Sequence, residues 1–221
     1  SVGLPLTIGD DGLRQREKLA CASICYGLIV LLARLFNRGN ALTGGLFVVA
    51  CLALPWVCAS PSDLRRSIHV RRSGWALAVA IGAGYLVLSL VWSSGIVLLG
   101  GVGISWWWRA AADRVGLTMG SLLARLTLAV AEEFFFRGFI QLSVLELVFH
   151  GPKRGLISRP NAIAAVAFGL ANLAASRSPG SLLSIPGGLA LGWLVERSDD
   201  SIWPSVAVHT VSNLVIAGLS L

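Results

Sequence analysis

Long apolar runs fill most of this 221-residue chain, and they limit its fold more strongly than any other feature. Short polar or basic connectors separate seven such runs, which cover residues 19–36, 41–59, 75–100, 115–149, 162–175, 182–195 and 202–221. A helix needs about 20 mostly apolar residues to cross the hydrocarbon core of a bilayer, and most of the runs approach or exceed that length. The pattern therefore predicts an all-α fold, a polytopic transmembrane helical bundle of about seven spans.

The composition is typical of a protein in lipid rather than in water. Hydrophobic residues make up 55% of the chain and charged residues only 13%, whereas about a quarter of the residues in soluble domains are charged. We expect a polar N-terminal segment over residues 1–18 and one transmembrane helical domain over residues 19–221. The run 115–149 is too long for one perpendicular span, so we expect it to tilt, protrude or break near Gly138.

Basic residues give the chain a formal net charge of +7 and stand mainly at the ends of the apolar runs. If the spans alternate in direction, eleven Lys and Arg residues fall on one side of the membrane and five on the other. The positive-inside rule then places the N-terminus on the cytoplasmic side, or its organellar equivalent. These residues are interpreted as topology markers of a bacterial inner-membrane or organellar multi-pass protein, and no nucleic-acid partner is expected.

The four cysteines lie inside or at the edges of apolar runs, at Cys21, Cys25, Cys51 and Cys58. None belongs to a C-x-x-C pair of the kind that binds zinc or carries redox chemistry. We interpret all four as small apolar packing residues, which give no information on the redox compartment.

The most informative residues are the few polar groups inside apolar runs, because an ionisable side chain at bilayer depth is costly unless it meets a partner or a wet cavity. Glu132, Glu133 and Arg137 all lie within the run 115–149. Glu133 and Arg137 are spaced i,i+4, so they can form an ion pair that either locks helix packing or takes part in chemistry. Glu132 points about 100° away around the helix and has no obvious local counter-ion, which makes it a candidate general base.

Two later runs carry further polar groups. Asn172 shares a helix face with Phe168, and an asparagine in a membrane helix commonly forms an interhelical hydrogen bond. His209 and Asn213 are again spaced i,i+4, so one helix face can present an imidazole and a carboxamide to the same cavity. The whole set suggests hydrolysis, in which a carboxylate takes a proton from water and neutral donors hold the oxyanion that forms at a carbonyl.

A metal centre is the alternative chemistry for the same residues. The side chains of Glu132, Glu133 and His209 can all bind metal ions, but the sequence has no H-E-x-x-H motif. One histidine with carboxylates and amides is a weak ligand set for zinc. We therefore expect no cofactor and keep a metal ion as the second choice.

These motifs resemble those of the CAAX protease and bacteriocin-processing enzyme family (CPBP, or Abi), which includes the type II CAAX prenyl endopeptidases. The segment 132–137, Glu-Glu-x-x-x-Arg, matches the family's first motif, and the segment 209–213, His-x-x-x-Asn, matches its last. The resemblance covers about residues 115–213. It implies a helical membrane bundle around a conical, water-accessible cavity in which peptide bonds are cleaved within or near the membrane.

The resemblance also implies a role for each matching residue. Glu132 would activate the attacking water without a metal, and Glu133 and Arg137 would support it. His209 and Asn213 would hold the oxyanion. The partners implied are the lipid bilayer and either a membrane-anchored peptide, prenylated or carrying a leader sequence, or other membrane proteins.

The sequence departs from the family pattern at one position, because Asn172 stands where the middle motif Phe-x-x-x-His has its histidine. Asparagine can donate and accept hydrogen bonds but cannot shuttle a proton at neutral pH. Either Asn172 positions the water and hydrolysis survives, or the scaffold has lost catalysis and serves as a structural or assembly subunit of a larger membrane complex. A transporter or channel with Glu132 in its pathway is a third interpretation, which depends on buried charge alone.

Overall fold

Helices account for the regular structure in the residues that the computed structural model describes, which are 8–36, 41–99, 119–149 and 157–219. No strand occurs in these ranges, and the all-α prediction is confirmed. In chain order the helices are α1 (Ile8–Phe36), α2 (Ala41–Ala53), α3 (Pro55–Cys58), α4 (Pro61–Ile68), α5 (Trp75–Leu99), α7 (Met119–Glu133), the π-helix η1 (Phe134–Leu145), α8 (Glu146–Val148), α9 (Arg159–Ser176), the 3-10 helix η2 (Pro179–Leu183), α10 (Ser184–Arg197) and α11 (Trp203–Leu219).

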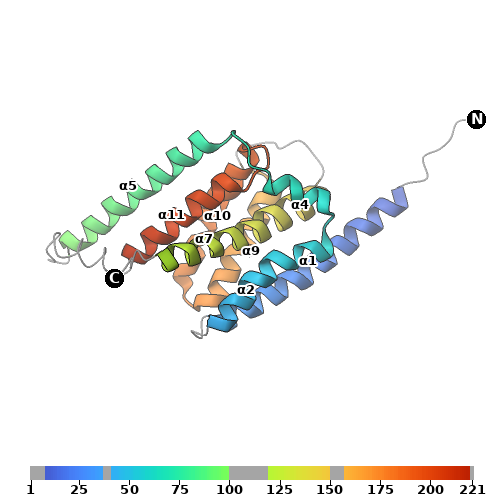
Figure 1. Cartoon of the computed structure of the whole chain (residues 1–221), viewed down its shortest axis with the longest axis horizontal. Coiled ribbons are helices and arrows are strands. Elements are labelled where there is room, and N and C mark those ends of the chain that lie inside the picture. Colours follow the sequence, from blue (N-terminus) through green and yellow to red (C-terminus); the bar gives the residue numbers. More distant parts are fainter. Residues whose placement is uncertain (1–7, 37–40, 100–118, 150–156, 220–221) are drawn as a thin grey trace, which may run out of the picture.

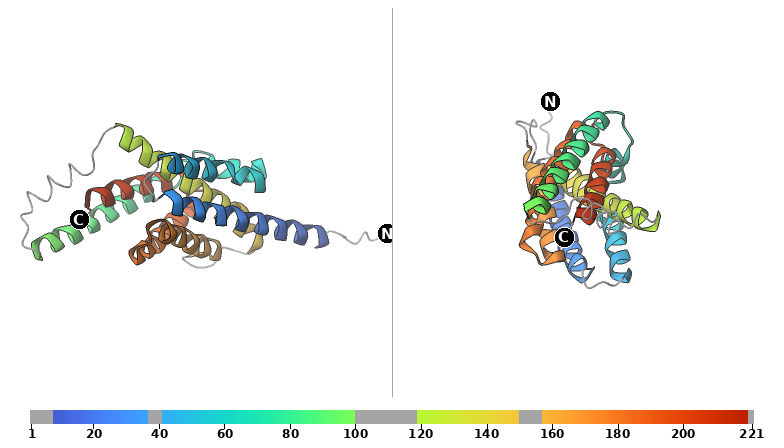
Figure 2. Two further views of the ribbon diagram at one scale, coloured as in Figure 1. Left: turned by 90° about the horizontal axis from the view of Figure 1, so that it is seen from below. Right: turned by 90° about the vertical axis from the view of Figure 1, so that its left-hand side faces the viewer.

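The helices form a bundle with two outer pairs (Figure 1). α1 and α2 pack together along one edge, α5 packs on α11 along another, and α7, η1, α9 and α10 lie between these pairs. The N-terminal turns of α1 extend beyond the rest of the bundle (Figure 2). The segment 1–18 was predicted as a separate polar segment. Its residues from Ile8 onward belong to α1, which continues into the apolar run without a break.

The long run predicted at 115–149 is continuous where the structure describes it, passing from α7 through η1 into α8. Of the three alternatives expected for this run, which were to tilt, to protrude or to break near Gly138, the break does not occur. The helix widens instead into a twelve-residue π-helix that is buried along its whole length. Gly138 serves close packing there, because a Cβ atom at this position would lie 2.8 Å from the Ser67 Oγ of α4.

One end of the bundle carries a network of ion pairs built around α4. Lys18 Nζ of α1 lies 3.4 Å from an Asp63 carboxylate oxygen, and Arg66 forms ion pairs with Asp200 and Glu146. Burial by itself would lower the pKa of Arg66, but its hydrogen bond to Asp200 and the neighbouring carboxylates together raise that pKa above its usual value. The network joins α1, α4, α8 and the α10–α11 connection at one level.

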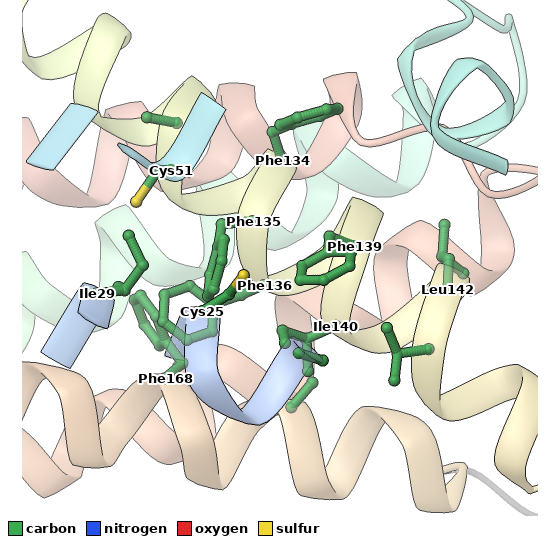
Figure 3. Packing of buried hydrophobic residues seen from close by; sticks show 14 of the residues in the cluster. Cys25, Ile29, Cys51, Phe134, Phe135, Phe136, Phe139, Ile140, Leu142 and Phe168 are labelled. Carbon is green, nitrogen blue, oxygen red and sulfur yellow. The ribbon is translucent and has the colours of Figure 1, made fainter. Parts of the chain in front are cut away.

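The apolar core next to this network is dominated by phenylalanine rings (Figure 3). Phe135 and Phe136 of η1 meet edge to face with their centroids 5.2 Å apart, and Phe136 meets Phe168 of α9 in the same way at 5.2 Å. Ile29 of α1 is completely buried in this cluster. Edge-to-face ring pairs add to the free energy gained by burial, so the cluster fixes η1 against α1 and α9.

Besides its apolar core, the bundle has buried charges and strongly exposed apolar side chains. Glu133 and Arg137 have no exposed surface, whereas Val57, Val79 and Leu88 each expose more than two-thirds of theirs. By length and composition, one helix in the described ranges can cross a membrane, Gln15–Leu35, and two shorter apolar helices, Leu42–Cys58 and Trp75–Val91, fall below that length. The seven spans therefore stay a prediction.

The interpretation of all four cysteines as packing residues is wrong for two of them. Cys21 of α1 and Cys58 of α3 form a disulfide, with their Cα atoms 6.0 Å apart. Cys25 and Cys51 are free and buried, and the Cys25 Sγ lies 3.5 Å from the Cys58 Sγ. The pairing depends on the antiparallel packing of α1 against α2 and α3, which brings together residues 37 positions apart in the sequence.

Candidate active site

A cavity of about 1050 Å³ lies between α5, α7, α9, η2, α10 and α11. Four of the residues singled out from the sequence line it, namely Glu132, Asn172, His209 and Asn213. Much of the remaining lining is apolar, and the cavity reaches the η2 segment at the end of the bundle opposite the ion-pair network. Such a volume is at the upper end of the range for small-molecule and cofactor sites.

Glu133 lies behind the cavity wall and is fully buried. Its Oε1 lies 2.8 Å from the His209 Nδ1, and its Oε2 accepts a hydrogen bond from the Ser205 Oγ at 2.6 Å. The Glu133 Oε2 also lies 3.6 Å from the Arg137 Nε, so the ion pair predicted from the i,i+4 spacing is formed. An ionised carboxylate can only accept hydrogen bonds, which assigns a proton to the His209 Nδ1.

Glu132 meets the same histidine from the other side. Its Oε2 lies 3.4 Å from the His209 Nε2, and its side chain is 13% exposed toward the cavity. The two adjacent carboxylates of α7 therefore face opposite nitrogens of one imidazole ring. No counter-ion for Glu132 was evident within its own helix, whereas the fold supplies one, His209, from α11.

This arrangement does not suit one metal ion bound by Glu132, Glu133 and His209 together. Because Glu132 and Glu133 approach opposite ring nitrogens, the imidazole of His209 stands between the two carboxylates and all three groups cannot ligate one ion. Among the described residues, one group of three potential ligands has its donor atoms within 4.8 Å of one another, namely the sulfurs of Cys21, Cys25 and Cys58. Two of those sulfurs form the disulfide.

Arg137 completes the buried part of the site. Its guanidinium lies over the Phe168 ring, 5.4 Å from the centroid, and that ring meets the His209 ring edge to face at 5.7 Å. Its Nη1 and Nη2 atoms are buried and make no hydrogen bond to any described residue. The Phe168 ring therefore contacts both the guanidinium of Arg137 and the imidazole of His209.

The two asparagines occupy the cavity wall in different ways. The Asn172 Nδ2 donates to the Phe168 carbonyl oxygen at 3.2 Å and to the Ser184 Oγ at 3.4 Å, so this amide connects α9 to α10. Asn213 lies one turn beyond His209 on α11, and its backbone oxygen accepts from the Arg125 Nη1 at 3.3 Å. All six predicted site residues are thus grouped in one region, four on the cavity and two behind it.

Two residues of this region, Ser205 and Arg125, were not predicted from the sequence. Ser205, which donates to Glu133, precedes His209 by four positions and therefore shares its helix face. Arg125, which lines the cavity, precedes Glu132 by seven positions and also shares a face with it. In both cases the signal was a polar residue at helical spacing from a residue already chosen.

Residues 114–215 match the sequence model of a family described as Rce1-like, type II CAAX prenyl endopeptidase Rce1-like. This match contains the whole segment 115–213 for which the resemblance was predicted, together with all six predicted site residues. No curated protein and no solved structure matches the chain.

Proposed function

We propose, on the premise that residues 114–215 match the Rce1-like family of type II CAAX prenyl endopeptidases, that the protein is an intramembrane endopeptidase. Its substrate is a membrane-anchored peptide, prenylated or carrying a leader sequence. The observation that carries the proposal is the pair of groups on the cavity, the Glu132 carboxylate and the His209 Nε2, 3.4 Å apart. Glu133 holds the far side of the imidazole and fixes which nitrogen faces the cavity.

The proposed reaction is a general-base hydrolysis. Glu132 accepts a proton from a water molecule while the water oxygen attacks the carbonyl carbon of the peptide bond. The electron pair of the carbonyl moves onto its oxygen, which Asn213 and the doubly protonated imidazole of His209, through its Nε2–H, stabilise as hydrogen-bond donors. When the tetrahedral intermediate collapses, the C–N bond breaks and Glu132 returns the proton to the leaving amine.

The buried residues have positioning roles in this mechanism. Glu133 and Ser205 orient the imidazole through its Nδ1, and Arg137 balances the charge of Glu133. The apolar lining excludes bulk water, which strengthens each of these electrostatic interactions. No step needs a metal ion, and we expect chelators to leave the reaction unchanged.

The exposed apolar side chains and buried charges of the bundle support a multi-pass arrangement in the membrane. Exposed apolar side chains such as Val57 and Val79 suit contact with lipid, and buried charges such as Glu133 and Arg137 suit a protein interior at bilayer depth. We place the ion-pair end, with Lys18 and Arg66, on the cytoplasmic side because basic residues favour that side. The cavity then opens toward the opposite side.

The proposal is tested by cleavage of defined peptides. Purified protein in detergent would be incubated with an S-farnesylated cysteine peptide or with a leader peptide, and the products identified by mass spectrometry. We expect cleavage of at least one class by the wild type, none by Glu132→Gln, and no effect of EDTA or phenanthroline. Equal cleavage by the wild type and Glu132→Gln would remove Glu132 from the mechanism.

A second function, a non-catalytic subunit of a membrane complex, is favoured by the contacts of Asn172. Its amide connects the Phe168 carbonyl of α9 to Ser184 of α10, which is a packing role. The variant Asn172→His separates the two proposals: a gain of proteolysis indicates a degenerate catalytic site, and unchanged cleavage indicates an adapted one. Stable co-purification of another membrane protein, together with no cleavage by either form, supports the subunit.

A further inference from the structure

Arg125 is a charged residue on the cavity that the proposed mechanism does not use. Its Nη1 donates to the Asn213 backbone oxygen at 3.3 Å, and its Nε is buried without a hydrogen-bond partner among the described residues. No carboxylate in the part of the chain that the structure describes forms an ion pair with it. A guanidinium in such an apolar environment is costly unless a ligand or water compensates its charge.

We propose that Arg125 binds a carboxylate of the substrate, the free C-terminal carboxylate of the peptide, and thereby sets which peptide bond reaches Glu132. The position of the cleaved bond rests on the function proposed above, whereas the binding of a carboxylate does not. The planar guanidinium of arginine pairs with a carboxylate through two parallel N–H groups, and this geometry gives orientation as well as affinity.

The spacing along α7 gives the length of peptide that fits between the two residues. Arg125 and Glu132 are seven positions apart and both line the cavity, so they share a helix face. At 1.5 Å per residue this separation is about 10.5 Å along the helix axis. An extended peptide spans about 3.3–3.6 Å per residue, so about three residues fit between a carboxylate at Arg125 and a bond at Glu132.

The wall between these two residues suits apolar peptide side chains. Leu128 lies between them on α7, and Ile81, Leu191 and Val208 contribute from α5, α10 and α11. Arg125 is the one arginine or lysine among the cavity-lining residues that the structure describes. A short apolar segment that ends in a carboxylate therefore matches both the lining and the charge of this part of the cavity.

Binding of paired peptides tests the proposal. The probes are N-acetyl-(S-farnesyl)Cys-Val-Ile-Leu as the free acid, the same peptide as the C-terminal amide, and an amide in which the last residue is glutamate. Dissociation constants would be measured in the Glu132→Gln background, where the peptides stay intact. We expect the first amide to bind about 10–100-fold more weakly than the acid, the range for a hydrogen bond to a charged group.

Variants at Arg125 distinguish recognition from a structural role. Arg125→Gln should bind acid and amide alike, and Arg125→Lys should restore part of the difference. Arg177→Gln is the matched control, because Arg177 is exposed and does not line the cavity, and it should keep the full difference. An equal loss of affinity for both peptides in Arg125→Gln would indicate a structural role and overturn the proposal.

The remaining outcomes separate the inference from the proposed function. Equal dissociation constants for acid and amide in Arg125-containing protein, or no measurable binding of the acid, overturn the inference whether or not peptides are cleaved. If the glutamate-ending amide binds like the acid, the terminal carboxylate is not what is recognised and the proposal fails. Discrimination that depends on Arg125 without any cleavage by the wild type refutes the endopeptidase and leaves the inference standing.

Discussion

Glu132 and Glu133 are adjacent in the chain, yet we predict that replacing Glu133 by glutamine affects stability and replacing Glu132 by glutamine affects activity. Glu133 is fully buried and pairs with Arg137, whose side chain is fully buried as well. Glu132 borders the cavity, and its ion-pair partner among the described residues is His209. Glu133→Gln should therefore lower stability, whereas Glu132→Gln should abolish hydrolysis and leave stability almost unchanged.

The size of the stability effect follows from the surroundings of Arg137. Glutamine in place of Glu133 keeps one acceptor oxygen for the His209 Nδ1–H and can donate from its amide nitrogen to the Ser205 hydroxyl, so the loss is mainly the negative charge. Removing one partner of a buried ion pair costs about 3–5 kcal/mol because the other charge stays buried. For a domain of 150–250 residues, each kcal/mol shifts Tm by roughly 2–4 °C, so the lower end of this range predicts a fall of about 6–12 °C.

Thermal unfolding in detergent, followed by the fluorescence of the eight tryptophans, measures this difference directly. Ser205→Ala is a graded control, because it removes one hydrogen bond to Glu133 and keeps the charge. Its fall in Tm should lie between those of Glu132→Gln and Glu133→Gln. If Glu132→Gln lowers Tm as much as Glu133→Gln, or if Glu133→Gln unfolds like the wild type, the separation into a cavity carboxylate and a structural carboxylate is refuted.

Two further predictions concern packing. The Cys21–Cys58 disulfide closes a long loop, so Cys21→Ser should reduce stability by about 4 kcal/mol because the unfolded chain gains entropy. Reductant should lower the Tm of the wild type but not that of the variant. A wild-type Tm that does not respond to reductant would contradict the presence of this bond. Gly192→Ala places a Cβ atom against the Asn161 Oδ1 and, at 2.6 Å, the Gln141 Oε1, and should destabilise by about 1–3 kcal/mol in thermal unfolding. Gly187→Ala on the same helix meets nothing within 4 Å and should be neutral or stabilising, and equal losses in the two variants would contradict this packing.

The helices and the grouping of polar residues could be predicted from local sequence patterns. Long apolar runs bounded by charged residues identified the helical segments, and the i,i+4 spacing identified the Glu133–Arg137 pair. Both depend on neighbours within a few turns of one helix, where geometry is nearly constant. The continuation through Gly138 could not be predicted in this way, because it depends on the packing of Ser67 from α4 against that glycine.

Contacts between distant helices could not be predicted for the same reason. The position of His209 between two carboxylates depends on how α11 is rotated and placed against α7, and no spacing within either helix encodes that relation. The Cys21–Cys58 disulfide likewise depends on how α1 and α3 pack. The polar groups that need partners could be identified from the sequence, but their partners on other helices could be identified only from the fold.

The contacts of Glu132 favour catalysis over a purely structural role for this cavity. Arg137 is balanced by Glu133, and the imidazole of His209 is already oriented through its Nδ1, so Glu132 is not needed to hold the ring and adds a second ion pair to it from the cavity side. A second carboxylate at this depth adds a desolvation cost and no packing contact that the network needs. The subunit hypothesis explains the hydrogen bonds of Asn172 but gives Glu132 no purpose, whereas a hydrolase needs a carboxylate in this position, beside a histidine and open to the cavity.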